Sequence, residues 1–329
     1  SEIGVNHNGS VKLAKKLIDK SIEAGADAVK FQSFKASTLS SKFTPKAKYQ
    51  LSEKKNETHY QMLKKLEFNG KKFDEIIKYC KKKNIKLIST PYNTDNIEYL
   101  YKKGLKIIKV ASADLIDHRM HKLLSKLKNI EVIISTGMAN YKEIGQTMKF
   151  YKFKKKNIYL LQCVSNYPSS LFSQNLNIIN RLKQKFKVEV GFSDHTKGSF
   201  CSQLAVAAGA KIIERHFTLN KNMSGPDHKA SLNPVELKKF IKKIREVEKI
   251  LGNDNKICQN EEEDMKKVSR KSVVSLKKIV SGERLTLKNI TCKRPGTGIP
   301  ASNYFNILGK KIFKTVDKDQ LILKEMFKK

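Results

Sequence analysis

The chain has 329 residues, of which 39% are hydrophobic, so it is long enough to bury one large core and a second, smaller one. It contains no run of about 18 apolar residues, which argues against a membrane-spanning helix. The formal net charge of +36 comes from lysines spread over nearly every helical segment, not from one patch interleaved with aromatic residues. This distribution is typical of solvated helix faces and argues against nucleic-acid binding.

Five cysteines lie far apart and form no Cys-x-x-Cys pair: Cys80, Cys163, Cys201, Cys258 and Cys292. Their odd number and wide spacing favour free thiols in a reducing compartment. No charged segment followed by an apolar one opens the sequence, so we expect a cytoplasmic protein.

Eight short β-branched or apolar runs alternate with helix-length amphipathic segments. The expected strands are Glu2–Val5, Ala28–Gln32, Leu87–Thr90, Ile107–Ser112, Val132–Gly137, Ile158–Val164, Val188–His195 and Lys211–Phe217. The expected helices span 10–25, 71–84, 94–103, 118–129, 140–151, 173–186, 198–209 and 233–251. Eight such units predict a (β/α)8 TIM barrel, an α/β fold, over residues 1–252. An open doubly wound sheet is disfavoured because no Gly-x-Gly-x-x-Gly follows a strand.

Three regions fall outside this repeat. Residues 34–68 show weak periodicity apart from a short helix at 57–66, so we expect a lid or substrate loop, or else a segment packed under the barrel. Residues 253–268 are polar and acidic and are interpreted as a linker. Residues 269–329 predict a small β-rich unit with strands at Lys271–Leu276, Ile279–Leu285, Ile290–Lys293, Ile307–Lys314 and Leu321–Leu323.

Polar residues stand near the ends of the expected barrel strands. Because catalytic groups of such barrels lie at the carboxyl ends of the strands, these residues predict one shared mouth. His195 and His216 end the last two strands, and two imidazoles suit an open divalent-metal site. No third protein ligand is obvious; the candidates are Glu2, Asp194, Glu214 and Asp227.

A second group of residues suits an anionic substrate. Lys30 and Lys109 offer positive charge, while hydroxyls and backbone N–H groups at helix entries come from Ser112, Ser135, Thr136, Gly137 and Ser193. Glu2 stands beside Asn6, His7 and Asn8, and this polar density suits a general acid or base.

Several short motifs carry a family resemblance: Glu2-Ile-Gly-Val-Asn-His-Asn-Gly9, Val29-Lys-Phe-Gln32, Ser135-Thr-Gly-Met138, Gly191-Phe-Ser-Asp-His-Thr196, Glu214-Arg-His-Phe-Thr218 and Lys293-Arg-Pro-Gly296. In this order and spacing the chain resembles the sialic acid (N-acetylneuraminate) synthase family. These are phosphoenolpyruvate-dependent nonulosonate synthases, built from a TIM barrel followed by an antifreeze-like (SAF) domain. The resemblance covers nearly the whole chain.

The resemblance implies that the enzyme condenses phosphoenolpyruvate with N-acetylmannosamine, or a close N-acetylated hexosamine, to give N-acetylneuraminate and phosphate. Departures from the family pattern at Ala111-Ser-Ala-Asp114 and Ser165-Asn-Tyr167 leave a legionaminate synthase, acting on a diacetamido-trideoxyhexose, as an alternative. A related barrel acting on a phosphorylated sugar would not need the C-terminal unit. A non-catalytic carbohydrate-binding protein is disfavoured because Glu2, both lysines and both histidines are present.

The resemblance also implies roles for individual residues. A divalent ion, Mn²⁺ or Mg²⁺, would be bound by His195 and His216, with Glu2 as a further catalytic residue. Phosphoenolpyruvate contacts match Lys30, Thr90, Lys109, Ser112, Ser135, Gly137 and Ser193, and sugar contacts match Gln32, Tyr167, Asp227 and Arg294. In the family the arginine comes from the partner subunit, whose C-terminal domain caps the barrel, so a domain-swapped homodimer is expected.

Overall fold

The computed structural model describes residues 1–47, 50, 57–68 and 70–328. It divides into two compact units, Ser1–Gly252 and Asn253–Lys329. In the described part of the chain, no helix is both long and apolar enough to cross a membrane. The division falls at Gly252, the residue at which the sequence analysis ended the barrel.

The first unit is an eight-stranded parallel sheet in which neighbouring strands pair in chain order. The strands are β1 (Glu2–Gly4), β2 (Ala28–Gln32), β3 (Lys86–Thr90), β4 (Ile107–Val110), β5 (Glu131–Ser135), β6 (Ile158–Cys163), β7 (Glu189–Asp194) and β8 (Ile212–Arg215). A parallel bridge between Glu2 and His216 joins the last strand to the first, and Phe217 N–H donates to the Glu2 carbonyl at 2.8 Å. The predicted TIM barrel is confirmed.

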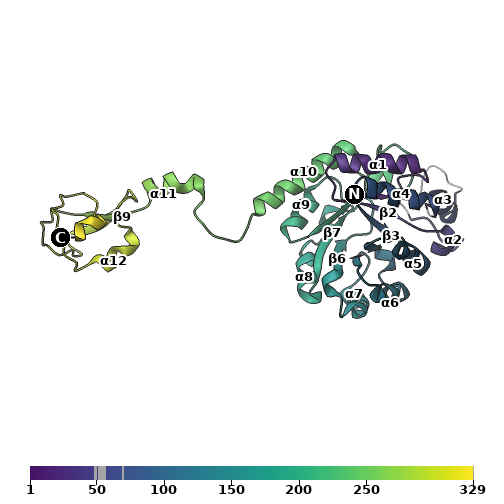
Figure 1. Cartoon of the computed structure of the whole chain (residues 1–329), viewed down its shortest axis with the longest axis horizontal. Coiled ribbons are helices and arrows are strands. Elements are labelled where there is room, and N and C mark those ends of the chain that lie inside the picture. The colour runs from purple at the N-terminus through teal and green to yellow at the C-terminus, as the bar shows by residue number, and fades with distance from the viewer. Residues whose placement is uncertain (48–49, 51–56, 69, 329) are drawn as a thin grey trace. The chain divides into compact units, whose positions relative to one another are not determined.

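Helices surround this sheet (Figure 1). They are α1 (Val11–Glu23), α2 (Ala36–Leu39), α3 (His59–Leu66), α4 (Lys71–Lys82), α5 (Thr94–Lys102), α6 (His118–Lys126), α7 (Tyr141–Met148), α8 (Asn177–Phe186), α9 (Phe200–Ala207) and α10 (Pro234–Leu251). α1 begins where Ser10 accepts a hydrogen bond from Leu13 N–H, and its Leu17 and Ile18 are buried. α1 therefore presents an apolar stripe to the strands and its lysines to solvent.

Successive side chains along each strand alternate between the core that faces the helices and the lumen of the barrel. In β2, Val29 and Phe31 join the core between strands and helices, whereas Lys30 lines the pocket inside the barrel. Ile108 and Lys109 divide in the same way on β4. Because successive side chains of a strand point to opposite faces, each apolar residue that anchors a strand also directs its neighbour into the lumen.

The connection after β2 lies at the pocket side of the barrel. α3 begins with a capping box between Thr58 and Gln61. Its Met62, Leu63 and Leu66 form a small buried cluster with Val5, Phe34 and Ala36 and also line the pocket. The alternative that this segment packs beneath the barrel is therefore wrong. Residues 48–49 and 51–56 of the connection lie outside the described residues.

Several strands end earlier than the sequence predicts. β4 stops at Val110 because Ser112–Asp114 form a 3-10 turn, and β7 and β8 stop just before His195 and His216. At these positions the chain leaves the regular strand pairing and its polar side chains point into the barrel mouth. The candidate residues Ser112, His195 and His216 thus stand in the turns that follow the strands.

The second unit contains α11 (Glu263–Ser269), β9 (Ser272–Ser275), β10 (Ile290–Lys293) and α12 (Tyr304–Ile307). β9 pairs antiparallel with β10, and isolated bridges such as Ile279 with Val316 extend the β-structure. Its core is separate and includes Val273, Ile279, Leu285, Ile290, Ile312, Val316 and Ile322. The predicted small β-rich unit is confirmed.

Two details of this second unit differ from the prediction. The segment interpreted as a linker, 253–268, contains most of α11, which carries Glu263 and Asp264 in its first turn and Lys266 and Lys267 in its last. This charge order favours a helix because it matches the helix dipole. The strands expected at Ile279–Leu285, Ile307–Lys314 and Leu321–Leu323 form only isolated bridges, at Ile279, Arg284, Lys311 and Leu321.

Two glycines test the packing of the barrel. A Cβ at Gly191 on β7 would lie 2.4 Å from the Ile212 carbonyl oxygen and 2.5 Å from Leu161 Cδ2, whereas a Cβ at Gly145 in α7 would meet only Phe186, at 3.9 Å. We expect Gly191→Ala to lower the free energy of unfolding by roughly 1–3 kcal/mol through overpacking. Gly145→Ala should raise it by about 0.5–1 kcal/mol. Urea unfolding followed by circular dichroism measures both, and equal midpoints for the two variants would contradict this account.

Candidate active site

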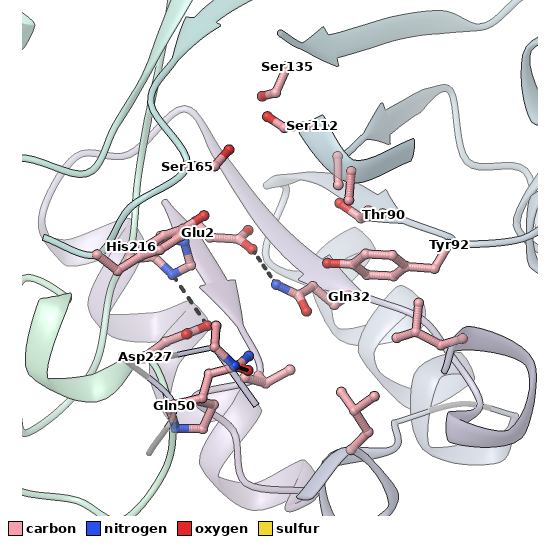
Figure 2. Close-up of a pocket in the computed structure, with 18 of the residues that line it drawn as sticks. Glu2, Gln32, Gln50, Thr90, Tyr92, Ser112, Ser135, Ser165, His216 and Asp227 are labelled. Carbon is pink, nitrogen blue, oxygen red and sulfur yellow. Dashed lines mark hydrogen bonds and ion pairs between the residues drawn. The ribbon is translucent and has the colours of Figure 1, made fainter. Parts of the chain in front are cut away.

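A pocket of about 510 Å³ lies at the carboxyl ends of the strands, and Figure 2 shows its polar side chains converging. The family resemblance assigned roles to fourteen residues, and the pocket brings together twelve of them: Glu2, Lys30, Gln32, Thr90, Lys109, Ser112, Ser135, Tyr167, Ser193, His195, His216 and Asp227. Gly137 lies directly behind Ser112, and Arg294 lies in the second unit, immediately after β10. The role of Arg294 in sugar binding stays a prediction.

Two lysines and two carboxylates form the floor of the pocket. Lys30 Nζ lies 2.7 Å from Glu2 Oε2 and 3.7 Å from Glu214 Oε2. Lys109 Nζ lies 3.8 Å from the same Glu214 oxygen. All four side chains are at most 13% exposed, so their charges interact with little screening by water.

These four charged groups shift one another's pKa values. Burial would raise the pKa of Glu214, but Lys109 and Lys30 outweigh burial and hold this pKa well below its usual range. Burial would lower the pKa of Lys30, but Glu2 and Glu214 outweigh it and raise this pKa. Lys109 has less compensation, and burial lowers the pKa of its ammonium group. For Glu2, burial raises the pKa of the carboxyl although Lys30 opposes the shift. Glu2 is thus a stronger proton acceptor than an exposed carboxylate.

Hydroxyl groups surround these lysines. Lys109 Nζ donates to Ser135 Oγ at 2.7 Å, and Lys30 Nζ donates to Thr90 Oγ1 at 3.4 Å. Ser193 Oγ donates to Glu214 at 2.8 Å. The cations and hydroxyls together form a pocket floor that suits a small anion bearing a phosphate or carboxylate group.

Gly137 shapes the hydroxyl side of the pocket without lining it. Its N–H donates to Ser112 Oγ at 3.0 Å. A Cβ at this position would lie 2.3 Å from Ser165 Oγ and 2.8 Å from Ser112 Oγ. Any larger residue would therefore displace Ser112 from the pocket wall.

The two histidines face each other with ring centroids 5.7 Å apart. His195 Nδ1 lies 2.8 Å from the Val164 carbonyl, so Nδ1 carries a proton and Nε2 is the nitrogen left to bind a metal. Burial would lower the pKa of His195, but Cys163 and the Val164 carbonyl outweigh burial and raise this pKa. His216 Nδ1 is buried without a hydrogen-bond partner, 3.7 Å from Asp227 Oδ2. Burial lowers the pKa of His216 well below its ordinary value, which keeps the imidazole neutral, the form that binds a metal.

These imidazoles fit a divalent ion that keeps other positions open. Among the described residues, no group of three or more His, Cys, Asp or Glu side chains is arranged to hold a metal ion. Asp194, one of the sequence candidates for a third ligand, lies 2.8 Å from Arg215 and accepts from Thr196 and Ser202. Glu214 forms ion pairs with Lys30 and Lys109. An ion held by two nitrogens would leave its remaining positions to water and substrate oxygens.

The outer part of the pocket combines polar groups with an apolar wall. Gln32 Nε2 donates to Glu2 Oε1 at 3.2 Å (Figure 2). The Tyr167 ring lies 4.0 Å from the His195 ring, centroid to centroid. Burial raises the pKa of Asp227 to about 6. Opposite these groups, the apolar wall consists of Val5, Leu39, Met62, Leu63 and Leu66.

Sequence reasoning missed several lining residues. Glu214 was considered only as a metal ligand, although its position two residues before His216 on one strand indicated that it points into the barrel. Cys163 at the end of β6 carried the same signal, and its Sγ lies 3.8 Å from His195 Nδ1. Leu39, from the connection after β2, lies in a stretch of weak periodicity, and the short helix predicted at 57–66, which contains His59, gave no sign that it reaches the pocket.

A parallel barrel with an anion-binding floor and two imidazoles at its mouth defines a TIM-barrel enzyme of small anionic substrates. Residues 17–256 match the model of the NeuB family, and residues 270–328 match the SAF domain. The chain belongs to the NeuB family of phosphoenolpyruvate-dependent nonulosonate synthases. It is an enzyme of the class that joins phosphoenolpyruvate to a sugar through a new carbon–carbon bond.

Relatives span nearly the full chain. The N,N'-diacetyllegionaminic acid synthase of Campylobacter jejuni is 45% identical over 326 residues, 98% of this chain and 97% of that protein. The human N-acetylneuraminate-9-phosphate synthase is 34% identical over 99% of this chain and 91% of its own length. A crystal structure of the N-acetylneuraminic acid synthetase from Leptospira borgpetersenii, in complex with citrate, has a TM-score of 0.71 at 34% identity. It covers 80% of this chain and 88% of that one.

Glu214 provides a test of the charged floor. Replacing it by Gln leaves Lys30 and Lys109 buried with one carboxylate fewer, so we expect a loss of about 3–5 kcal/mol in the free energy of unfolding at pH 7. The lowered pKa of Glu214 means that its stabilisation is present above the ordinary pKa of a glutamate and is lost as the pH falls through the folded value. The difference between Glu214→Gln and the unsubstituted protein should therefore stay nearly constant from pH 7 to about 5 and shrink as the pH falls further, from about 4 to 2. Urea titrations across this range measure it, and a difference that grows toward acid pH would refute the charge assignment.

Proposed function

We propose that the enzyme condenses phosphoenolpyruvate with a 2,4-diacetamido-2,4,6-trideoxyhexose, giving N,N'-diacetyllegionaminate and inorganic phosphate. The observation that carries the condensation is one pocket that joins two buried lysines, a ring of hydroxyls and two histidines. The choice of acceptor is supported by the Campylobacter jejuni relative, an N,N'-diacetyllegionaminic acid synthase, at 45% identity.

In this proposal the floor of the pocket binds phosphoenolpyruvate. Lys30 and Lys109 neutralise its phosphate and carboxylate, and the hydroxyls of Thr90, Ser112, Ser135 and Ser193 complete the shell. Holding both anionic groups fixes C3 of phosphoenolpyruvate toward the wider part of the pocket, where the sugar enters. Most of the rate acceleration from these residues comes from positioning.

His195 and His216 would hold the divalent ion, Mn²⁺ or Mg²⁺. When bound, such an ion supplies Lewis-acid polarisation of the aldehyde oxygen of the open-chain sugar. C3 of phosphoenolpyruvate then forms a bond to the aldehyde carbon, and water adds at C2. The C2–O bond to phosphate breaks and leaves the 2-keto acid. Glu2, whose raised pKa suits a base, takes one proton of the attacking water and passes it to the former aldehyde oxygen, which becomes a hydroxyl, while the other proton leaves with the phosphate.

The apolar wall of Val5, Leu39, Met62, Leu63 and Leu66 supports a trideoxy acceptor. A methyl at C6 and the methyls of two acetamido groups would bury against these side chains, whereas a C6 hydroxyl would lose hydrogen bonds to water there. Gln32, Tyr167 and Asp227 would bind the remaining polar groups. N-acetylmannosamine, which would give N-acetylneuraminate, is the second candidate because the structurally similar Leptospira borgpetersenii protein is an N-acetylneuraminic acid synthetase.

We further propose a cytoplasmic, domain-swapped homodimer in which Arg294 reaches the acceptor bound by the partner. The five cysteines are free thiols, which suits a reducing compartment. The family resemblance is the support for the exchange of C-terminal units.

The identity of the acceptor sugar can be tested by comparing two candidate sugars. Purified protein is incubated with phosphoenolpyruvate, Mn²⁺ and either 2,4-diacetamido-2,4,6-trideoxymannose or N-acetylmannosamine, and phosphate release and product mass are followed. We expect kcat/KM to be at least about tenfold higher for the trideoxy sugar, a difference of about 1.4 kcal/mol that one well-buried methyl group can supply. Chelation should abolish turnover and Mn²⁺ should restore it. Faster reaction with N-acetylmannosamine would reassign the acceptor, and no phosphate release with either sugar would refute the proposed function.

The proposed role of Arg294 predicts complementation between subunits. Arg294→Ala should raise KM for the sugar while leaving KM for phosphoenolpyruvate unchanged, because the floor of the pocket is intact. Mixing this variant with Lys109→Met, which keeps Arg294 but lacks a floor cation, should restore part of the activity when subunits exchange. Lys293→Ala, one residue earlier, is the matched control. No recovery in mixtures whose subunit exchange is demonstrated by native mass spectrometry would argue against the swapped cap.

A further inference from the structure

A second cleft lies outside the catalytic pocket. It has a volume of about 380 Å³ and shares no lining residue with that pocket. Its walls come from the loop after β7, the connection after β8 and the outer turns of α10. Six of its lining side chains are cationic: Lys197, Arg215, Lys221, Lys229, Lys239 and Lys243. We call it the lysine cleft.

The charge of the lysine cleft is poorly balanced. Glu236 is the one acid in the lining, and it is paired with Lys221 at 2.7 Å. Arg215 is paired with Asp194 at 2.8 Å. Lys197, Lys229, Lys239 and Lys243 form no ion pair with any described residue. Four uncompensated ammonium groups around one concave site raise its affinity for anions above that of a flat lysine-rich surface.

α9 begins at this cleft, and its N-cap residue Ser199 is part of the lining. The Ser199 side chain makes no capping hydrogen bond, and its Oγ accepts from Gln203 Nε2 at 3.0 Å. The positive end of the helix dipole therefore adds to the positive potential of the cleft.

Arg215 forms the base of the lysine cleft and is 4% exposed. Its guanidinium donates to the backbone carbonyls of Asp194, at 3.1 Å, and Thr196. Its Nε is buried without a hydrogen-bond partner. The Asp194 carboxylate that pairs with Arg215 also accepts hydrogen bonds from Thr196 and Ser202. Arg215 therefore holds this part of the cleft wall in a fixed position, while the exposed lysines supply the net positive charge.

We propose that the lysine cleft is a binding site for a phosphate group, separate from the catalytic pocket. The four lysines outside the Lys221–Glu236 pair all line this one cleft. A compact anion with two or more charges would neutralise them better than a single carboxylate would. The cleft is larger than a phosphate ion requires, and Pro168, Leu232 and Phe240 line its apolar part. The phosphate is therefore either the free ion or one carried on a small organic group.

The site is physically joined to the catalytic histidines. Arg215 holds the residues on either side of His195, and Ser169 N–H, next to Pro168 of the cleft, donates to the His195 carbonyl at 2.9 Å. An occupant of the lysine cleft would thus stabilise the segment that positions His195.

Equilibrium dialysis with radiolabelled inorganic phosphate tests the site, with ionic strength held constant. The full-length Lys109→Met variant serves as background because it removes a floor cation of the catalytic pocket. We expect one phosphate per chain to remain bound. Adding Lys239→Gln and Lys243→Gln should weaken this binding at least about tenfold. The control pair Lys78→Gln and Lys82→Gln removes the same charge at the same spacing on the exposed face of α4 and should leave binding unchanged.

Other results decide against the site or identify its ligand. Absence of bound phosphate, or equal weakening by both lysine pairs, would overturn the proposal, since the second result means a general effect of net charge. If Lys109→Met does not fold by circular dichroism, the same dialysis is done on unsubstituted protein saturated with phosphoenolpyruvate. Competition by a hexose 6-phosphate or a nucleoside 5'-monophosphate at lower concentration than inorganic phosphate would show that the site takes a phosphomonoester. No step requires turnover, so the outcome is independent of the acceptor sugar.

Discussion

The structure depends on keeping two lysines and two carboxylates charged inside a barrel. Lys30, Lys109, Glu2 and Glu214 are nearly excluded from solvent, and each compensates the others across 2.7–3.8 Å. Buried charges of this kind cost several kcal/mol of desolvation unless partners surround them. The strands therefore have to deliver both signs to one level of the lumen. An anionic substrate that enters this site meets cations whose positions are already set, so little reorganisation accompanies binding.

The apolar layer between strands and helices determines which side chains face the lumen. Phe31 and Ile108 are anchored in the outer core, and their immediate neighbours Lys30 and Lys109 must then face inward. The same rule sends Arg215 outward and Glu214 and His216 inward from β8 and the turn that follows it. One strand thus contributes to the catalytic pocket on one face and to the lysine cleft on the other. Packing in the core and chemistry at the mouth are consequences of the same two-residue period.

Much of this architecture was predictable because it follows from short-range patterns. Eight apolar runs with helical spacers predict the barrel, and polar residues at strand ends predict which side chains meet at its mouth. The pairing of Glu214 with both lysines was not predictable, since it depends on the stagger between β2, β4 and β8 and not on spacing within any one of them. The apolar wall was also missed because the helix predicted at 57–66, which is α3, gave no sign of which part of the barrel it packs against. The helix α11 was hidden by its acidic composition, which resembles that of a linker.

The small cluster around α3 has a further consequence. Met62, Leu63 and Leu66 pack with Val5, Phe34 and Ala36 apart from the main core, so their packing energy is separate from that which holds the barrel closed. Local opening of such a cluster requires far less free energy than global unfolding. This apolar wall of the pocket can therefore open locally while the charged floor stays intact. A substitution within the cluster would reshape the pocket with little effect on the stability of the charged floor.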